Sequence, residues 1–552
     1  MAQTRYKQLN QISFADLEVY SVLPEHPIWS RAAEVLDFSF ADEICAPLYA
    51  SRGPKPYAPS LKLKLHLVQR YYNLSDRAME ERVIGDLFIK RFLGLPVSFI
   101  GFDHSTIALD RERMGSDLFD ACHHHILAQA KQKGLWGGEK DVWLIDSFHT
   151  DGRVPRRSSF RLIKQAVLRV MNHLKRAHPP LYRQLNLDLK LDVLSDKLPA
   201  TATPEDVAAL YSQLVVFAYG LLHWFEKPAI RKLFWSWEKQ DRQLESLVRQ
   251  GILFRILNEN TMPEDPEDPE RPYEKRPRSK RPTDRLLSSV DPDARVAKKR
   301  GKTYFGDKTQ VLMSTEHDMV LLAEPFPCNE HDGQSLPEIV EAVWYIHRVT
   351  PEAVVGDSAY GYGRHRRSFA NGSMKLVAPL QAVHDNPKGL FSNKRFTYDS
   401  EAQTMTCPAG IVTSKHHDNR HLKGTQFTFP KQACMTCTLR ESCTTSASGR
   451  SIFISDYYEE FQAAEAFNET DEGKHLLKQR NAVERKINEM KNAQGLGQAR
   501  TCSRERRRRD VKLVCMVVNL KQFIKQATNK LTLGFVRKRP LRLSAPFSGK
   551  LA

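Results

Sequence analysis

The 552-residue chain lacks the segments that mark membrane and secreted proteins. It has no run of about eighteen apolar residues, so a membrane-spanning helix is not expected. The first residues, MAQTRYKQLNQISF, lack a charged start followed by an apolar stretch, so no secretion signal is expected either. Internal repeats are absent, and the one biased segment is the charged, proline-rich stretch at 263–285. We therefore expect a cytoplasmic protein of roughly two to four domains.

The nine cysteines do not form a regular framework. Four of them fall within a short stretch: Cys407, Cys434, Cys437 and Cys443. In a non-secreted chain this favours reduced thiols over disulfides. Cys434 and Cys437 have the spacing of a zinc knuckle, and the other two could complete four ligands. Only half of a CxxC…CxxC pattern is present, so a structural Zn²⁺ and a set of reduced, partly buried thiols both remain open. Three nearby histidines are alternative ligands: His416, His417 and His421.

Acidic residues are outnumbered, with 65 Asp and Glu against 83 Lys and Arg. The formal net charge is +18 and the pI is near 9.4. This excess suggests a polyanionic partner, because neutralising phosphates releases condensed counterions. Charge alone leaves a merely basic, soluble protein as the alternative.

Residues 28 to about 130 have the apolar spacing of helices. We predict one helix with Ser60 as its N-cap, a second that begins at Ser75 and ends at Gly94, and a third after His104. Short basic helices with tight turns are typical of a helix-turn-helix-like DNA reader, although any small helical bundle has the same pattern.

Two short apolar runs each end in an aspartate: DVWLIDSF at Asp146 and EAVVGDSAYG at Asp357. Such runs are typical of buried strands, and the end of a strand opens at the rim of a sheet. Adjacent strands would bring the two carboxylates together. Phosphoryl transfer needs several carboxylates, because two Mg²⁺ ions about 3.5–4 Å apart stabilise the attacking and leaving oxygens. For either aspartate alone, a turn or cap role is the simpler interpretation.

A third carboxylate lies in a helix predicted from about 474 to 492. Arg480, Glu484 and Lys491 stand at i, i+4 and i+11, which places them within about 40° of one another around the helix. A carboxylate flanked by two cations suits a metal site beside DNA phosphates. An ordinary surface pair would explain Arg480 and Glu484 without any chemistry.

This helix resembles a signature of the DDE transposases of bacterial insertion sequences. The spacing Leu477-x2-Arg480-x3-Glu484-x6-Lys491 is similar to their Y-x2-R-x3-E-x6-K pattern, with Leu477 in place of tyrosine. VDPDARVAKKRGKTYFGDKTQVL resembles a hairpin of the family, with Asp307 where the family often has tyrosine. CNEHDGQSLPEIV resembles the step into the first sheet helix, and the segment from LDFSFADEI to FIKRFLGL resembles the family's DNA-binding domain.

The resemblance implies an α/β fold: an RNase H-like mixed sheet with flanking helices, an N-terminal all-helical DNA-binding domain and inserted segments. Asp146 would lie on the first strand, Asp357 at the end of the fourth, and Glu484 on the helix after an insertion. These three would be the catalytic residues and the ligands of two Mg²⁺ or Mn²⁺ ions. His331 and Asp332 would help to shape the site.

The implied enzyme is a DNA transposase, an endonuclease and strand transferase. It would recognise terminal inverted repeats of double-stranded DNA, join them to target DNA, and work as a homodimer or higher assembly in the bacterial cytoplasm. One metal ion would activate water and later a DNA 3′-hydroxyl, and the other would stabilise the leaving oxygen. A catalytically inactive DNA-binding relative and a metal-dependent nuclease without strand transfer are the alternatives.

The expected domains follow the changes in sequence pattern. They are a helical DNA-binding domain at 1–135, a catalytic domain at 136–157, 286–384 and 471–530, a helical insertion with its linker at 158–285, a cysteine-containing insertion at 385–470 and a basic tail at 531–552.

Nine cations are expected to contact DNA: Arg480, Lys491, Arg485, Lys308, Arg295, Arg507, Arg508, Arg111 and Arg113. Two of them lie in the run RERRRRDVK. This run is expected to contact DNA phosphates, and the alternative is that it forms a solvated face of the protein. Three consecutive histidines at 123–125 are expected to be solvated, because consecutive residues on a helix point in different directions.

Overall fold

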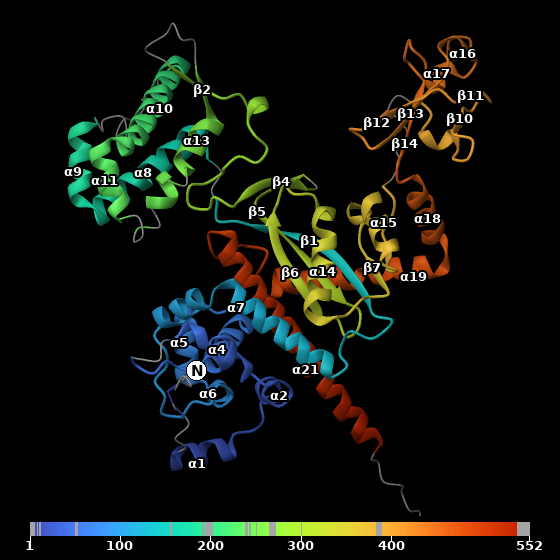
Figure 1. Cartoon of the computed structure of the whole chain (residues 1–552). Coiled ribbons are helices and arrows are strands. Elements are labelled where there is room, and N and C mark those ends of the chain that lie inside the picture. Colours follow the sequence, from blue (N-terminus) through green and yellow to red (C-terminus); the bar gives the residue numbers. More distant parts are fainter. Residues whose placement is uncertain are drawn as a thin grey trace, which may run out of the picture.

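The computed structural model has a central mixed sheet from which two inserted segments extend on different sides (Figure 1). It describes residues 6, 7, 9, 13–49, 53–154, 157–189, 194, 202–237, 241, 244–249, 251–263, 272–299, 301–381 and 389–537.

Six strands form the central sheet, in the order β4-β5-β1-β7-β8 with β6 also paired to β5. Their bounds are β1 (Val142–Asp151), β4 (Arg295–Lys299), β5 (Lys302–Ser314), β6 (Val320–Pro327), β7 (Ala353–Val355) and β8 (Lys375–Val377). β5 runs antiparallel to β1, β4 and β6, whereas β7 and β8 run parallel to β1. The strand pattern of KTYFGDKTQVLMST and MVLLAEPF, separated by EHD, predicts a hairpin, and the pairing of β5 with β6 confirms it.

β1 is longer than the sequence suggests. It continues past Asp146 because β5 pairs with it from Trp143 to Asp151. The prediction that this strand ends at Asp146 is wrong, since the aspartate lies in the middle of a ten-residue strand. β7, by contrast, ends at Val355, and Asp357 follows it as the N-cap of the short helix η6 (Ser358–Tyr360).

Seven helices precede the sheet among the described residues: α1 (Phe14–Val22), α2 (Trp29–Val35), α3 (Phe40–Ile44), α4 (Pro59–Tyr71), α5 (Asp76–Gly85), α6 (Leu87–Leu93) and α7 (His104–Gln132), with the short η1 (Ala46–Leu48) after α3. Ser75 caps α5 as predicted, because its side chain accepts a hydrogen bond from the Ala78 amide. Ser60 does not cap α4, since both its amide and its hydroxyl donate to Asp42. The predicted helix from Ser75 to Gly94 is two helices, because extended backbone at Asp86 separates α5 from α6.

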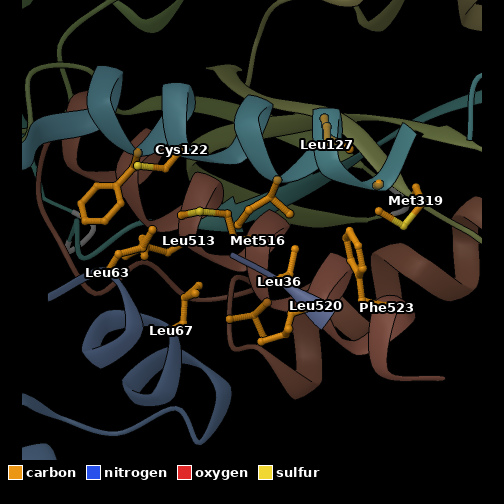
Figure 2. Close-up of a cluster of buried hydrophobic side chains, with 14 of the residues drawn as sticks. Leu36, Leu63, Leu67, Cys122, Leu127, Met319, Leu513, Met516, Leu520 and Phe523 are labelled. Carbon is orange, nitrogen blue, oxygen red and sulfur yellow. The ribbon is translucent and has the colours of Figure 1, made fainter. Parts of the chain in front are cut away.

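The long C-terminal helix α21 (Arg504–Arg537) lies between the N-terminal helices and the sheet (Figure 1). One of its faces, with Leu513, Met516 and Leu520, packs on α4 and α7. Figure 2 shows these side chains in one cluster with Leu63, Leu67, Cys122 and Leu127. The opposite face packs against the sheet through four other residues: Val511, Val514, Cys515 and Val518. Residues 511–520 of α21 are all buried, so this part of the helix joins the N-terminal helices to the sheet.

The histidines of α7 are placed by this packing. His123 and His124 are buried and His125 is exposed. The His123 ring nitrogen lies 3.1 Å from the Val320 carbonyl oxygen, and His124 lies 3.0 Å from the His347 ring. The prediction that all three are solvated is wrong for the first two, because α7 turns that face toward α21 and the sheet.

The helical insertion has a core of its own. It consists of α8 (Ser159–Ala177), α9 (Pro179–Asp188), α10 (Pro204–Glu226), α11 (Pro228–Trp237), the π-helix η3 (Glu245–Arg249) and α13 (Ile252–Asn260). α10 is the one described helix that is long and apolar enough to cross a membrane, but half of that stretch is buried inside the protein. Leu214, Leu221 and Trp224 of α10 lie in the core of the insertion.

The charged stretch at 263–285, predicted to be a linker, contains the short strand β3 (Tyr273–Lys275) and the short η4 (Arg278–Lys280). β3 pairs with β2 (Thr261–Pro263), which directly precedes the stretch and ends at its first residue. Residues 264–271 of this stretch lie outside the described residues. Of the predicted basic tail, residues 531–537 belong to α21, and 538–552 also lie outside the described residues.

The cysteine-bearing segment folds into two small sheets around a core of five buried side chains, namely Phe396, Met405, Phe427, Phe429 and Ile452. Its elements are η7 (Asn393–Arg395), β9 (Thr397–Asp399), β10 (Thr404–Thr406), β11 (Val412–Thr413), β12 (His416–Asn419), β13 (Gly424–Thr428), α16 (Lys431–Met435), α17 (Arg440–Cys443) and β14 (Ser451–Ser455).

The remaining helices surround the sheet. They are η5 (Asp332–Ser335), α14 (Leu336–His347), α15 (Gly363–Asn371), α18 (Tyr458–Glu469), α19 (Asp471–Gln479), α20 (Asn481–Asn488) and the π-helix η8 (Glu489–Ala493). The helix predicted for 474–492 is thus three consecutive segments, with Arg480 at the first junction. The segment SLPEIVEAVWYIHRV predicts an amphipathic helix capped by Ser335. Ser335 does precede α14, but it makes no side-chain cap, since its hydroxyl donates to Glu330.

Candidate active site

Asp146 and Asp357 are brought together by the pairing of β1 with β7. In this parallel ladder Val142 lies beside Ala353 and Leu144 beside Val355. Asp146 follows Leu144 by two positions on β1, and Asp357 follows Val355 by two positions just beyond the end of β7. The two carboxylates are close enough for the charge of Asp357 to act on Asp146.

The face on which they lie follows from the alternation of side chains along a strand. Leu144 and Phe148 flank Asp146 on β1, and both belong to the core cluster that also contains Val483 of α20. Asp146 therefore points to the face of the sheet that α20 covers. Glu484 follows Val483 at the edge of that face, with 49% of its side chain exposed.

Arg480 links Glu484 to Asp146. Its guanidinium lies 2.8 Å from a carboxylate oxygen of Glu484, and its charge also reaches Asp146. Leu477, which stands at the tyrosine position of the resembling signature, packs against the same core cluster as Val483. Lys491 lies in η8, where the helix widens, and its carbonyl oxygen accepts a hydrogen bond from the Gly497 amide at 2.9 Å.

The charge of Asp146 is disfavoured in this position. Burial raises the pKa of Asp146 to about 6, against an ordinary 3.8. The Ser147 amide, which donates to it at 2.7 Å, lowers the pKa, and repulsion by Asp357 raises it. The positive charges of Arg480 and Lys299 also lower it. A buried carboxylate beside another carboxylate is an arrangement that a bound cation stabilises.

A third aspartate, Asp332, lies next to Asp146 and Asp357. The Ser147 hydroxyl donates to Asp332 at 2.9 Å, and Lys308 forms an ion pair with Asp332 at 2.6 Å. Burial alone would raise the pKa of Asp332, but the hydrogen bond and charge of Lys308 hold it below its usual range. His331 lies 2.6 Å from the Tyr362 hydroxyl. Of the two predicted shaping residues, Asp332 therefore contacts the residue next to Asp146, whereas His331 contacts Tyr362.

Close backbone contact holds this loop against the loop of Asp357. A β-carbon on Gly333 would overlap the Ala359 carbonyl oxygen, so only glycine fits there. Tyr360, from the same loop as Asp357, is fully buried, and burial together with the charges of Asp332 and Asp146 raises its pKa. Sequence reasoning missed Tyr360, because nothing in DSAYG separates it from an ordinary core tyrosine.

Comparison with known families matches both ends of the chain. Residues 17–113 match a family described as a transposase domain, DUF772, and residues 406–524 match a transposase DDE domain. The second match contains Glu484 and the helix segments around it. These two matches support an insertion-sequence DDE transposase. No solved structure matches the chain. A transposase of this family is a nucleic-acid-processing enzyme that acts on DNA, and the family typically uses divalent metal ions.

Several cations that were expected to face DNA are paired inside the transposase instead. Arg507, only 4% exposed, bonds to Asp291 and Asp307. Arg508 lies 2.5 Å from Asp117 and 3.0 Å from Glu324. Three more have acidic partners of their own, namely Arg295 with Asp284, Lys308 with Asp332, and Arg111 with Asp76. These pairs differ from the sequence expectation, because buried charges need partners and find them here within the protein.

Asp307, which stands where the family often has tyrosine, is buried and paired in the structure. Its side chain is 1% exposed and bonds to Arg504 and Arg507 at the start of α21. Burial raises the pKa of Asp307 although both arginines oppose this. Most basic residues of the run at 504–512 therefore form ion pairs that hold α21 to the rest of the protein.

The other expected DNA contacts remain at the surface of the transposase. Arg485 and Arg113 are exposed, and Arg480 and Lys491 are half-buried. A cavity of about 680 Å³ also opens beside β1, with His149 and His331 in its lining. Lys298 and Lys299, both exposed, line it as well. Sequence reasoning missed these two lysines, although the run VAKKRGK was a visible signal.

The four clustered cysteines of the transposase line one cavity of about 30 Å³, together with Arg440 and Arg450. All four are half-buried free thiols. Burial raises the pKa of Cys443, and the neighbouring thiols Cys434, Cys407 and Cys437 add to this. Within the described part of the chain, groups of three potential ligand atoms all within 4.8 Å occur at two other places, and neither contains a cysteine or a residue of the proposed triad.

The raised pKa of Asp146 gives a testable stability effect. A raised native pKa means that the folded state holds the proton more tightly, so stability falls as pH rises from the ordinary 3.8 through about 6. With divalent ions chelated, we expect Asp146→Asn to raise the free energy of unfolding above pH 6 by on the order of 1–3 kcal/mol, and to give no gain below the ordinary pKa.

Urea unfolding across this pH range measures the effect. Asp318→Asn, in the turn between β5 and β6, is the matched control and should show no such pH-dependent gain. A gain of Asp146→Asn that is equally large at both ends of the range would contradict the assignment.

Proposed function

We propose that this transposase cuts the terminal inverted repeats of its insertion sequence and joins them to target DNA, with Asp146, Asp357 and Glu484 as its catalytic, metal-binding residues. The parallel pairing of β1 with β7, which brings Asp357 within electrostatic reach of Asp146 on the side of the sheet that α20 covers, is the observation that carries the proposal. Mg²⁺ prefers oxygen ligands and keeps several waters, so these carboxylates and a DNA phosphate would suffice. The raised pKa of Asp146 fits a site that needs a cation.

When bound, a pair of Mg²⁺ or Mn²⁺ ions supplies activation of the attacking oxygen and stabilisation of the leaving 3′-oxygen. The protein's own groups orient the reactants. Arg480 holds Glu484 in place through its 2.8 Å ion pair, and with Lys491 it offers charge to a phosphate. Ser147, fixed by Asp332, positions the backbone amide that donates to Asp146.

We further propose an RNase H-like catalytic domain and the domain limits expected from the sequence, with the helices before residue 135 as DNA reader. The support is the topology: β5 pairs antiparallel with β1, β6 pairs antiparallel with β5, and β7 and β8 run parallel to β1 on its other side. Asp146 lies on the first of these five strands and Asp357 follows the fourth. The enzyme would act in the cytoplasm as a homodimer or higher assembly on DNA.

Strand transfer tests the triad. With Mg²⁺ or Mn²⁺ and a donor DNA carrying the element's ends, Asp146→Asn, Asp357→Asn and Glu484→Gln should each reduce joined product at least about 100-fold, since each removes a charged ligand of the metal site. Glu459→Gln, on the exposed side of α18, is the matched control and should retain activity.

DNA binding should survive all four changes, because it depends on distributed basic contacts. Unchanged strand transfer by Asp146→Asn or Glu484→Gln would overturn the metal-site assignment. Cleavage without joining by the unaltered chain would favour a nuclease, and binding without either reaction would favour an inactive relative.

The cavity beside β1 is the proposed path of DNA near the active site. Lys298 and Lys299 line it, and the charge of Lys299 reaches Asp146. Replacing both by alanine should weaken DNA binding for every sequence and reduce the slope of log affinity against log salt by about 2, since each phosphate contact contributes about 0.9.

Salt titrations of DNA binding measure this slope. Lys175→Ala/Lys232→Ala, a double change of exposed lysines in the helical insertion, is the matched control. An equal loss of slope in both double variants would contradict a specific DNA path through the cavity.

We propose one structural Zn²⁺ on Cys407, Cys434, Cys437 and Cys443. The support is their convergence on one small cavity, with Cys407 at a turn closed by the Gly410 amide at 2.8 Å. Four thiolates are a common structural zinc set. Cys437→Ser should lower zinc content by one equivalent per chain in elemental analysis. Cys502→Ser, a half-buried thiol elsewhere, should not, and equal zinc in the two variants would refute the site.

A further inference from the structure

Three potential metal ligands meet in the helical insertion, away from the carboxylates of the proposed active site. They are His173 on α8, His178 between α8 and α9, and Asp241 shortly before η3. One ligand atom from each lies within 4.8 Å of the other two. The side chains are 14%, 15% and 12% exposed, in that order. The group is thus largely shielded from water but still reachable by a small ion.

The backbone brings the two histidines together. Along a continuous helix, residues five positions apart point about 140° apart, so their rings would diverge. α8 ends at Ala177, however, and His178 has φ −135° and ψ 62°. The proline that follows disfavours helical backbone at His178. This break returns its ring toward His173, with the ring centroids 6.0 Å apart.

Asp241 completes the group from a distant part of the insertion. One of its carboxylate oxygens accepts a hydrogen bond from the Leu244 amide at 3.0 Å. Leu244 is buried in the core of the insertion, so this bond fixes the carboxylate. The other oxygen lies 2.5 Å from the His173 Nε2 and 2.6 Å from the His178 Nε2. Both imidazoles therefore aim at one oxygen atom.

Both carboxylate oxygens of Asp241 have defined partners, the Leu244 amide on one and the two histidine rings on the other. The bond from the Leu244 amide is the kind of outer hydrogen bond that orients a metal ligand.

We propose that His173, His178 and Asp241 bind a divalent transition-metal ion, with Zn²⁺ as the ion that the ligand set favours. Two imidazole nitrogens and one carboxylate oxygen suit Zn²⁺ and its transition-metal neighbours, whereas Mg²⁺ and Ca²⁺ prefer oxygen ligands alone. The site thereby differs in chemistry from the all-carboxylate active site. Three protein ligands leave a fourth position for water or another donor.

The ion would tie the junction of α8 and α9 to the segment before η3. Because the three ligands come together only in the folded insertion, binding would stabilise that fold. The competing interpretation is a carboxylate that simply accepts hydrogen bonds from two histidines, which requires no metal.

Histidine acylation by diethyl pyrocarbonate on the unaltered full-length protein distinguishes the two. Peptide mass spectrometry should find His173 and His178 at least about fivefold less acylated with Zn²⁺ than with a chelator, since metal ligation occupies the reactive nitrogens. His223, exposed on α10, should be acylated equally in both states. Equal acylation of His173 and His178 with and without Zn²⁺ would overturn the site, and protection by Mg²⁺ alone would overturn the transition-metal assignment.

A variant gives an independent measurement. Asp241→Asn keeps the side-chain shape and the bond to the Leu244 amide but removes the anionic ligand. In the full chain it should lose one zinc equivalent and the rise in Tm that added Zn²⁺ gives, while His223→Ala keeps both. Carrying each change in the Cys437→Ser background separates this ion from any zinc on the thiols. Equal zinc in Asp241→Asn and His223→Ala would refute the proposal.

Discussion

The parallel pairing of β1 with β7 is the contact on which the arrangement of the proposed active site depends. It is short, and β8 supports it by extending the same ladder beyond β7. A shift of β7 by one residue would turn Asp357 to the opposite face of the sheet, because side chains alternate along a strand. The closely packed turn of Gly333 and the core around Val483 both disfavour such a shift.

Many of the basic side chains of this protein form ion pairs with its own acidic side chains. The basic start of α21 is neutralised by acidic residues from α7 and the sheet, with the fully buried Lys512 lying 2.8 Å from Asp120 and 2.5 Å from Glu324. Removing one partner from such a cluster leaves an uncompensated buried charge, which is strongly unfavourable. The number of basic side chains that can contact DNA is therefore smaller than the net positive charge of the chain suggests.

Local sequence patterns predicted the features that depend on residues close together in the chain. The β5–β6 hairpin and the Ser75 cap are examples, as is the clustering of thiols. Features set by distant partners were not predictable in this way. Asp146 lies in mid-strand because β5 continues to pair with it, and His123 is buried because α21 and β6 lie against α7. Asp241, joined to two histidines more than sixty positions away, carried no signal at all.

The two-faced packing of α21 has a mechanical consequence. Since one side of the helix belongs to the core of the N-terminal helices and the other to the core of the sheet, neither part can swivel without opening apolar surface to water. If the N-terminal helices read DNA and the carboxylates of the sheet cut it, the distance between the two sites is fixed by the fold. The number of base pairs between the recognised sequence and the broken phosphodiester would then be measured by the protein's own dimensions rather than by a flexible tether.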